Sequence, residues 1–369
     1  MFFEASKTRA VTVPAAPAAF FQAFVQALVQ AFVQAFDHAF VQAFVQAVWL
    51  ACFACLAGCA PPQGSAAVTG SDDSRPRVVC TTTVVADLVR QVAGYRVAID
   101  CLMPAGVDPH SYRATPRDAD RLAGADLVVS SGLRLEGKLA DLLERLGRRV
   151  PVVAAADGLP HDALLATGPD AFDPHVWFDA ALWARCAPGV AEALARLDPA
   201  NAAVYRARAA DHAARLAALD ADVRARIATI PEGRRVLVTA HDAFRYFGRA
   251  YGIEVVAVQG TSTESEAGLG DVNRLVDLLV DRGIPAVFVE TSVADRNVAA
   301  LVEGAAARGH AVTLGGRLYS DSLGGPFSGF DTLEAALRAN VQTIVTALSG
   351  PSTAATPPAS PEPAAAVTP

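Results

Sequence analysis

The first half of the chain alternates short apolar runs with amphipathic stretches. Runs rich in valine and other β-branched residues predict strands at 77–83, 96–102, 126–130 and 150–154. The stretches between them predict helices at 84–93, from Pro116 onward and at 136–148. A proline suits the first turn of a helix, which supports the second of these. Strands that alternate with helices favour a parallel sheet covered on both faces.

The second half repeats this alternation. Its predicted strands are 235–239, 253–259, 286–290 and 311–314. Its predicted helices are 243–251, 268–282, 294–308 and 331–348. The run Val287-Phe288-Val289 is apolar at every position, which fits a strand buried on both faces.

The middle of the chain predicts one long helix. Asp198-Pro199 supplies an N-cap and a first-turn proline, and 200–230 contains neither glycine nor proline. At 1.5 Å per residue such a helix would be ~45 Å long, more than is needed to cross a sheet. We therefore predict an α/β fold of two lobes with parallel sheets joined by one long rigid helix. A coiled-coil arm is the alternative, but the segment has no sustained heptads.

The predicted boundaries follow from these patterns. They are a leader at 1–58, a flexible tether at 59–76, an N-terminal α/β lobe at 77–197, a connecting helix at 198–231, a C-terminal α/β lobe at 232–350 and a disordered tail at 351–369. The tether is rich in Pro, Gly, Ser and Asp, and the tail in Pro, Ala, Ser and Thr.

The leader is apolar and of low complexity. A four-residue unit, roughly Phe-Val-Gln-Ala, repeats from Phe20 to Val48, and no charge occurs between Ala39 and Cys59. The run ends in Leu56-Ala57-Gly58-Cys59, which resembles a lipobox, so we interpret 1–58 as a lipoprotein signal and Cys59 as the lipidated residue. Cations directly before the apolar core are missing, unlike in most signal peptides. An uncleaved anchor of about 20 residues is the alternative, and both place the rest of the chain outside the cytoplasm.

The net charge bears on the class of partner, and the cysteines bear on a possible disulfide. The net charge of −7 lies entirely beyond residue 58, because Glu4, Lys7, Arg9 and Asp37 cancel. This argues against a nucleic-acid partner, which would need a basic face. Beyond the lipobox cysteine, Cys59, the cysteines are Cys80, Cys101 and Cys186. Cys80 and Cys101 fall near the ends of successive predicted strands, and both a disulfide between them and free thiols remain open.

Four residues that bind metals well follow predicted strands or open a helix. They are His110, His175, His241 and Asp321, separated by 65, 66 and 80 residues. No local motif explains this spacing, but loops at the carboxyl ends of parallel strands converge. Three imidazoles and a carboxylate suit a divalent transition metal. Four protein ligands leave no open position, so the ion would be cargo or structural.

Other acids lie close to these residues in the sequence. Asp108 and Asp173 precede two of the histidines in Asp-Pro-His tripeptides, where they could orient the imidazole or cap local amides. Glu264, Glu266 and Glu290 lie near the ends of predicted strands and could bond a ligand histidine or neutralise the ion; a solvated loop acid is the alternative. Trp177 and Phe244 would wall the site from water.

Taken in order, these motifs resemble a known family, the TroA-like zinc/manganese receptors of bacterial ABC importers. The motifs are Met103-Pro104, Asp108-Pro109-His110-Ser111-Tyr112, Asp173-Pro174-His175-Val176-Trp177, Thr239-Ala240-His241-Asp242-Ala243-Phe244, Gln259-Gly260-Thr261-Ser262-Thr263-Glu264, Val289-Glu290-Thr291-Ser292 and Tyr319-Ser320-Asp321. The resemblance covers about 77–349. It implies two α/β lobes, a rigid connecting helix and one metal buried between the lobes, with His110, His175, His241 and Asp321 at the four ligand positions.

The resemblance also implies a function. The chain would be an extracytoplasmic solute-binding receptor, a monomer anchored through Cys59, that delivers its ion to an ABC permease and its ATPase. His241 stands where manganese receptors typically carry glutamate, so zinc is favoured and manganese is the alternative. The absence of a His/Asp-rich loop, common in zinc-specialised members, weakens that preference.

A zinc hydrolase and a cell-adhesion protein are the two other functions to consider for this sequence. An extracytoplasmic zinc hydrolase would need an open metal position and a general base, for which Glu264 or Glu290 could serve. No His-Glu-x-x-His motif occurs and a fourth ligand is present, so we expect no enzyme. Surface lipoproteins of this type sometimes also act in cell adhesion, which nothing in the sequence tests.

Overall fold

The computed structural model describes residues 74–265 and 267–349. The predicted signal at 1–58, the lipidated Cys59, nearly all of the tether and the tail at 351–369 lie outside the described residues. Among the described residues no helix is both long enough and apolar enough to cross a membrane.

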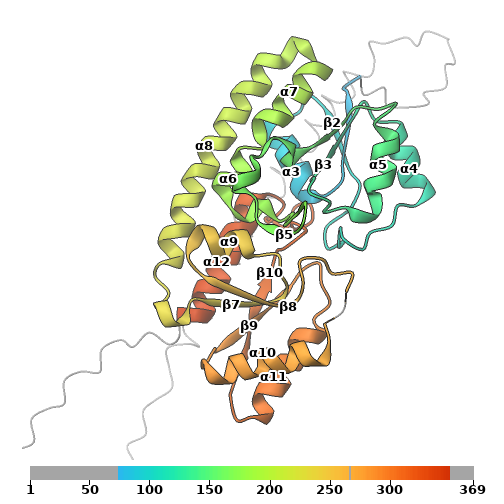
Figure 1. The fold of residues 1–369 in the computed structure, drawn as a ribbon. Helices are drawn as coiled ribbons and strands as arrows, with labels where there is room; N and C mark the ends of the chain where they lie inside the picture. Colours follow the sequence, from blue (N-terminus) through green and yellow to red (C-terminus); the bar gives the residue numbers. More distant parts are fainter. Residues whose placement is uncertain (1–73, 266, 350–369) are drawn as a thin grey trace, which may run out of the picture. The chain divides into compact units, whose positions relative to one another are not determined.

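The first group of strands forms one parallel sheet in the order β2-β1-β3-β4 (Figure 1). Its strands are β1 (Arg77–Cys80), β2 (Ala98–Cys101), β3 (Leu127–Ser130) and β4 (Val152–Ala154). The connecting helices are α3 (Thr83–Ala93), α4 (Pro116–Ala123) and α5 (Ala140–Leu146). The prediction of one helix over 136–148 was wrong in part, because a 3₁₀ turn at Gly137–Leu139 precedes α5.

Local signals explain where these helices begin. Thr82 caps α3, since its side chain accepts a hydrogen bond from the backbone N–H of Val85. Thr115 and Asp118 form a reciprocal capping box at the start of α4, with Pro116 in the first turn.

The second group of strands forms two parallel pairs, β7 with β8 and β9 with β10. The strands are β7 (Val236–His241), β8 (Glu254–Gln259), β9 (Ala286–Glu290) and β10 (Thr313–Leu318), and β7 also contacts β9. The helices are α9 (Arg245–Tyr251), α10 (Leu269–Asp281), α11 (Arg296–Ala307) and α12 (Leu333–Ser349).

The prediction of the last strand at 311–314 was wrong in its bounds, because two glycines hide the strand that follows. The register with β9 shifts between Leu314 and Gly316, and the strand continues to Leu318. A Cβ on Gly315 would lie 2.7 Å from the ring of Phe288, so only glycine fits this contact. A glycine pair is normally a turn signal, which concealed the strand.

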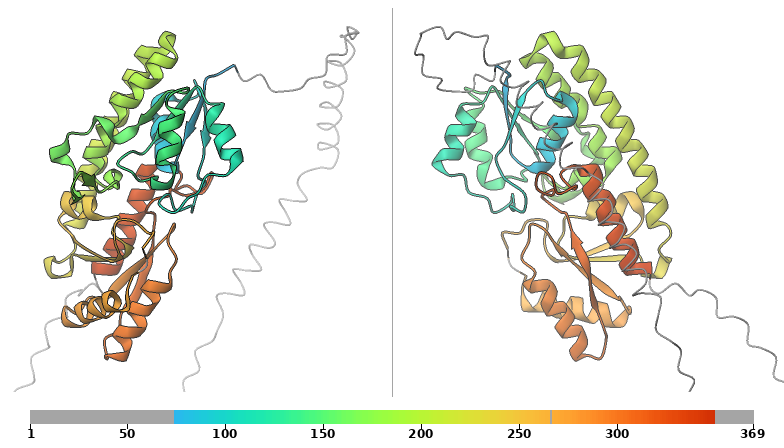
Figure 2. Two further views of the ribbon diagram at one scale, coloured as in Figure 1. Left: turned by 45° about the vertical axis from the view of Figure 1, so that its right-hand side comes forward. Right: turned by 180° about the vertical axis from the view of Figure 1, so that it is seen from behind.

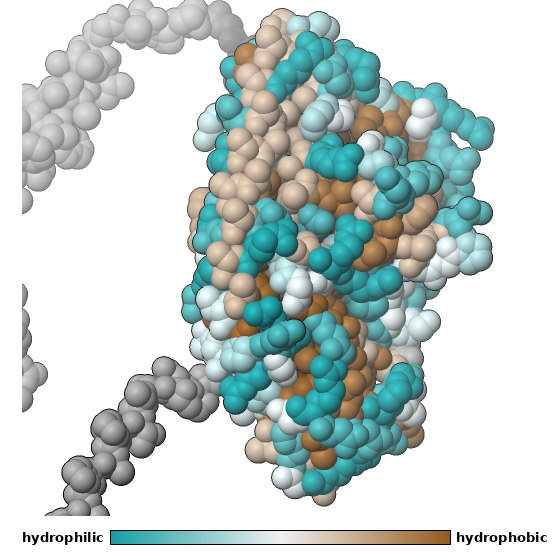
Figure 3. All heavy atoms as spheres, turned by 60° about the vertical axis from the view of Figure 1, so that its left-hand side comes forward, coloured by the Kyte–Doolittle hydropathy of each residue, from teal (hydrophilic) through white to brown (hydrophobic). Residues whose placement is uncertain are grey.

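One long helix, α8 (Ala202–Ile227), runs beside both groups of strands (Figures 1 and 2). Its 26 residues correspond to about 39 Å, so the predicted helix is confirmed but shorter. One part packs against α3, α6 (Ala180–Ala184) and α7 (Ala187–Leu197), and another against α9 and α12. The opposite face carries alanines among charged residues, and the surface on this side mixes hydrophilic with mildly hydrophobic residues (Figure 3).

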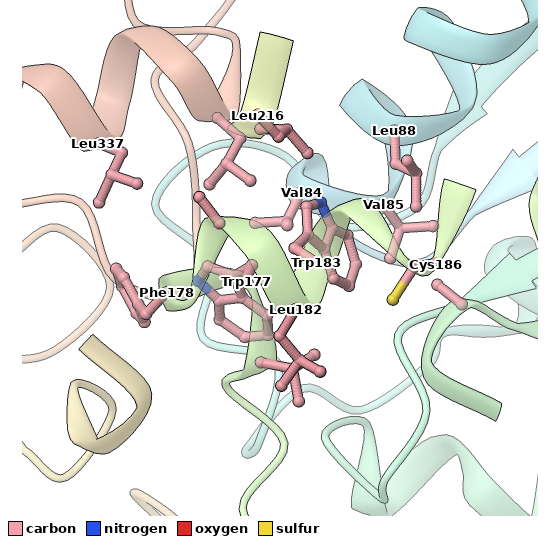
Figure 4. Packing of buried hydrophobic residues seen from close by; sticks show 14 of the residues in the cluster. Val84, Val85, Leu88, Trp177, Phe178, Leu182, Trp183, Cys186, Leu216 and Leu337 are labelled. Carbon is pink, nitrogen blue, oxygen red and sulfur yellow. The ribbon is translucent and has the colours of Figure 1, made fainter. Parts of the chain in front are cut away.

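Buried aromatic side chains fill the centre of the main core (Figure 4). Trp177 and Trp183 lie with ring centroids 6.4 Å apart, close to Val84 of α3, Leu216 of α8 and Leu337 of α12. This core therefore joins elements from before, within and after the long helix. The fold class is confirmed, while the predicted domain boundaries at 77–197, 198–231 and 232–350 stay a prediction.

Candidate metal centre

The structure brings the four predicted ligand residues to one point. One nitrogen or oxygen from each of His110, His175, His241 and Asp321 lies within 4.8 Å of the others, and all four residues are buried. His110 follows β2, His175 directly precedes a 3₁₀ turn at Val176–Phe178, and His241 is the last residue of β7. Asp321 lies three residues beyond β10.

The donor atoms of these side chains face one another. The Nε2 atoms of His110 and His175 are 3.2 Å apart. The two carboxylate oxygens of Asp321 lie 3.3 Å from Nε2 of His175 and 3.2 Å from Nε2 of His241. Nevertheless Nε2 of His241 and both Asp321 oxygens, although buried, have no hydrogen-bond partner among the described residues. Buried polar atoms without partners are rare and costly, so this cluster has lone pairs to offer an ion.

Two carboxylates fix the imidazoles from behind. Nδ1 of His175 lies 2.8 Å from Oδ1 of Asp173, and Nδ1 of His241 lies 2.6 Å from Oε2 of Glu290. A proton on each Nδ1 donates to the carboxylate, which leaves the lone pair of Nε2 directed at the common point.

The two Asp-Pro-His tripeptides form similar turns, but the side chains of their aspartates bond different partners. In each, the aspartate accepts a hydrogen bond from the backbone N–H of the histidine two residues on, at 2.9 Å for His110 and 3.0 Å for His175. Asp173 also bonds its histidine ring, whereas Asp108 bonds Ser111 and Thr263 instead. The first aspartate thus shapes a loop, and the second orients a ring as well.

The electrostatic environment favours a cation. Burial lowers the pKa of His110 to about 4, so that imidazole is neutral. Burial alone would also lower the pKa of His175, but the hydrogen bond with Asp173 and the nearby Asp321 carboxylate raise it to about 9. Burial is likewise outweighed at His241, where the carboxylates of Glu290 and Asp321 raise the pKa well above its usual value. Burial would raise the pKa of Asp321, yet the neighbouring histidines hold it well below its usual range. Three buried carboxylates surround this centre, which a divalent ion would neutralise.

An aromatic side chain, that of Trp177, lies against the centre. The ring of Trp177 lies 5.3 Å from that of His175, and its indole N–H donates to the carbonyl of Ser320 at 3.2 Å. Phe244 stacks on Phe178 at a centroid distance of 4.2 Å. Glu264 touches none of the histidines; it pairs with Lys138 at 2.5 Å and is 43% exposed.

Sequence reasoning missed two supporting residues. The hydroxyl of Tyr246 donates to the carbonyl of Asp173 and accepts from the N–H of Leu165, both at 3.0 Å. A guanidinium nitrogen of Arg245 lies 3.8 Å from Oδ2 of Asp173. Arg245 and Tyr246 directly follow the motif around His241, but nothing local signals a partner more than 70 residues upstream.

The cysteines of the described residues form no disulfide. Cys80 and Cys101 are register partners on β1 and β2, and both are free, as is Cys186. Burial raises the pKa of the Cys101 thiol to about 11 and of the Cys186 thiol to about 12, so neither is a reactive thiolate.

Known metal-binding proteins are similar to this chain in sequence and in fold. The family model for the periplasmic component A of the zinc-uptake complex matches residues 78–347. The chain is 43% identical over 302 residues to the manganese-binding lipoprotein MntA of Bacillus subtilis (strain 168), covering 82% of this chain and 97% of that protein. It is 42% identical over 277 residues to the zinc-binding protein TroA of Treponema pallidum (strain Nichols), covering 75% and 90%. The solved structure of the periplasmic zinc-binding protein TroA from Treponema pallidum matches with a TM-score of 0.73 over 74% of this chain and 99% of that one, at 42% identity.

Proposed function

This chain belongs to the family of periplasmic zinc-uptake component A proteins, and we propose that it captures one divalent transition-metal ion through His110, His175, His241 and Asp321. The family consists of extracytoplasmic solute-binding receptors of ABC metal importers, not enzymes. The ion is therefore cargo, collected outside the cytoplasm and delivered to a permease.

One observation carries the assignment of the ligands. Three of the converging atoms, Nε2 of His241 and both oxygens of Asp321, are buried without a hydrogen-bond partner. An ion would satisfy all three at once, and it would balance the buried carboxylates of Asp173 and Glu290. The guanidinium of Arg245, 3.8 Å from Oδ2 of Asp173, and protonation of the imidazoles also reduce this negative charge.

The closed arrangement supports a receptor over the hydrolase that the sequence left as an alternative. Catalytic zinc sites keep three protein ligands and an open position for water. Here a fourth residue faces the same point. Both carboxylate oxygens of Glu290 already bond His241, so this residue is not free to act as a general base. Nothing in the comparisons favours a hydrolase.

We propose zinc as the preferred ion, with manganese as the alternative. Three imidazoles make the donor set rich in nitrogen, which suits zinc better than manganese. The names of the relatives divide on this point, since one is called manganese-binding and another zinc-binding.

The anchoring and the partners are proposed together. A lipidated Cys59 would hold the receptor at the membrane, and a monomer would dock on an ABC permease that an ATPase drives. The tether at 59–76 would let the receptor reach that permease. Members of the family named as lipoproteins support the anchoring.

Metal competition tests this proposal. The full chain, purified in mild detergent and stripped with a chelator, is titrated with zinc and manganese, alongside His241→Ala and Asp321→Ala. One tight zinc per chain, weakened by both substitutions, is the expected result. Tighter binding of manganese would overturn the preference alone, and tight binding of neither ion would overturn the four-ligand site. Arg282→Met, which removes an exposed pair with Glu254, serves as the matched control.

A further inference from the structure

One hollow leads from the surface to the metal centre. It has a volume of about 490 Å³ and is lined by segments 133–138, 167–174 and 261–264 together with His110. His110 is the only one of the four ligand residues that lines it, and at 4% it is also the most exposed of the four. An ion would therefore enter or leave past His110.

An ion pair stands at the edge of this hollow. Nζ of Lys138, in the 3₁₀ turn at Gly137–Leu139, lies 2.5 Å from Oε1 of Glu264, in the connection from β8 to α10. Both residues also line a second hollow, of about 300 Å³, which reaches Asp108. The pair thus lies between two hollows, and it joins a segment from before α8 to one from after it.

The neighbouring residue makes a parallel contact. Oγ1 of Thr263 donates to Oδ2 of Asp108 at 2.6 Å. The other oxygen of Asp108 accepts the backbone N–H of His110 at 2.9 Å. Movement of Thr263 would therefore disturb the carboxylate that shapes the His110 loop. We call these two contacts, Lys138–Glu264 and Thr263–Asp108, the clasp.

The ion pair of the clasp can open easily, as a gate on the path of the ion must. Its ion pair is partly exposed, 30% at Lys138 and 43% at Glu264, so water and salt weaken it and it opens readily. The imidazoles of His175 and His241, by contrast, are held by buried contacts with Asp173 and Glu290. Opening the clasp would free the segment at 259–265 from the other side of the hollow while leaving the strands that carry His241 and Glu290 intact.

We propose that Lys138 and Glu264 are positioning residues that set the rate at which the ion passes His110. This inference rests on the proposed function and deepens it: the four ligands determine whether an ion binds, and the clasp determines how fast it exchanges. Breaking the ion pair should speed dissociation by about 1.4-fold to fivefold, the range expected for loss of one exposed ion pair.

The experiment measures the rate at which zinc leaves. The zinc-loaded full chain is mixed with an excess of a chromophoric chelator at low and at high salt. The variants are Lys138→Met, Glu264→Gln, the double variant and the exchanged pair Lys138→Glu with Glu264→Lys. Thr263→Val tests the second contact. Arg282→Met is the control, because Arg282 forms a similar exposed pair with Glu254 at 2.7 Å, away from the centre.

The expected pattern is specific to a gate. Each single variant and the double variant should release zinc equally fast, the exchanged pair should restore the slow rate, and one zinc should still bind per chain. High salt should speed release from the original chain and have little effect on Lys138→Met. Unchanged rates, or equal acceleration in Arg282→Met, would overturn the clasp while leaving the receptor intact. A chain that binds no zinc or manganese would overturn the proposed function and the clasp together.

Discussion

Glu290 holds His241 twice: Oε2 lies 2.6 Å from Nδ1 of the ring, and Oε1 accepts the backbone N–H at 2.9 Å. The two residues end β7 and β9, which belong to different strand pairs but contact each other, and this contact aligns the carboxylate with the imidazole. A ring fixed in this way can present only Nε2 to an ion.

Glu290→Gln should therefore weaken metal binding by about 10-fold to 100-fold without changing the stoichiometry. The amide keeps the shape but loses the charge that stabilises the donating Nδ1–H. Competition with a chelator of known affinity measures the effect. Glu254→Gln is the control, since Glu254 is exposed on β8 and pairs with Arg282. Equal affinity in both variants would contradict the role of the carboxylate.

Metal binding should release protons at neutral pH. The pKa of His175 is raised to about 9, so at neutral pH its imidazole carries a second proton in the metal-free protein, and the raised pKa of His241 acts in the same direction. Coordination requires neutral imidazole, so apparent affinity should rise with pH from 6 and level off above about 9. Calorimetry at pH 7.5 in two buffers of different ionisation enthalpy counts the protons. Identical heats in both buffers would refute this prediction.

His212 should make the metal-free protein sensitive to acid. It is buried in α8 with Nε2 unpartnered, and burial, aided by Arg215, lowers its pKa to about 4. As pH falls through 6.5 the unfolded chain takes up the proton first, so the folded state loses about 1–2 kcal/mol by pH 5. His212→Leu should lose correspondingly less stability between pH 7 and pH 5 in urea unfolding.

The control for this measurement is His161→Gln, because His161 is exposed. The control variant should follow the original chain at both pH values. If His212→Leu also follows it, the buried histidine is not the acid-sensitive group.

Gly248 should tolerate no side chain. A Cβ there would lie 2.7 Å from the carbonyl oxygen of Ile253 and 2.8 Å from a methyl group of Val255. Gly248→Ala should cost about 1–3 kcal/mol of unfolding free energy, because α9 could no longer pack on β8. Gly189→Ala in α7 meets no atom within 4 Å and should be neutral or stabilising by up to ~1 kcal/mol. Urea unfolding of both variants distinguishes a steric effect from the general effect of replacing glycine.

Much of the fold could be predicted because its elements announce themselves locally. The strand at Ala286–Glu290 is apolar throughout and was predicted to the residue. The helix that His175 was predicted to open begins as α6 at Ala180, whereas α7 received no prediction, since Pro188-Gly189 resembles a break. In the structure Pro188 occupies the first turn of α7, where its missing N–H costs nothing.

Part of the candidate site could likewise be predicted from the sequence, and part could not. Because strand ends converge, His110, His175, His241 and Asp321 were predicted to lie together. The structure confirms this, since one donor atom of each lies within 4.8 Å of the others. The partners of Asp108 and Glu264 could not be predicted, since Thr263 and Lys138 depend on how loops from distant segments approach each other. Local pattern locates such loops but does not specify their contacts.

The wide separation of the four proposed ligand residues along the chain has a mechanical consequence. An ion held by all four would act as a removable cross-link, closing loops of 65, 66 and 80 residues and spanning both sides of α8. Such closure restricts the unfolded chain, and binding only to the folded state adds stability in proportion to the logarithm of metal concentration over Kd. Outside the cytoplasm, where proteases remove unfolded chains, scarcity of the ion would shorten the lifetime of the receptor that collects it.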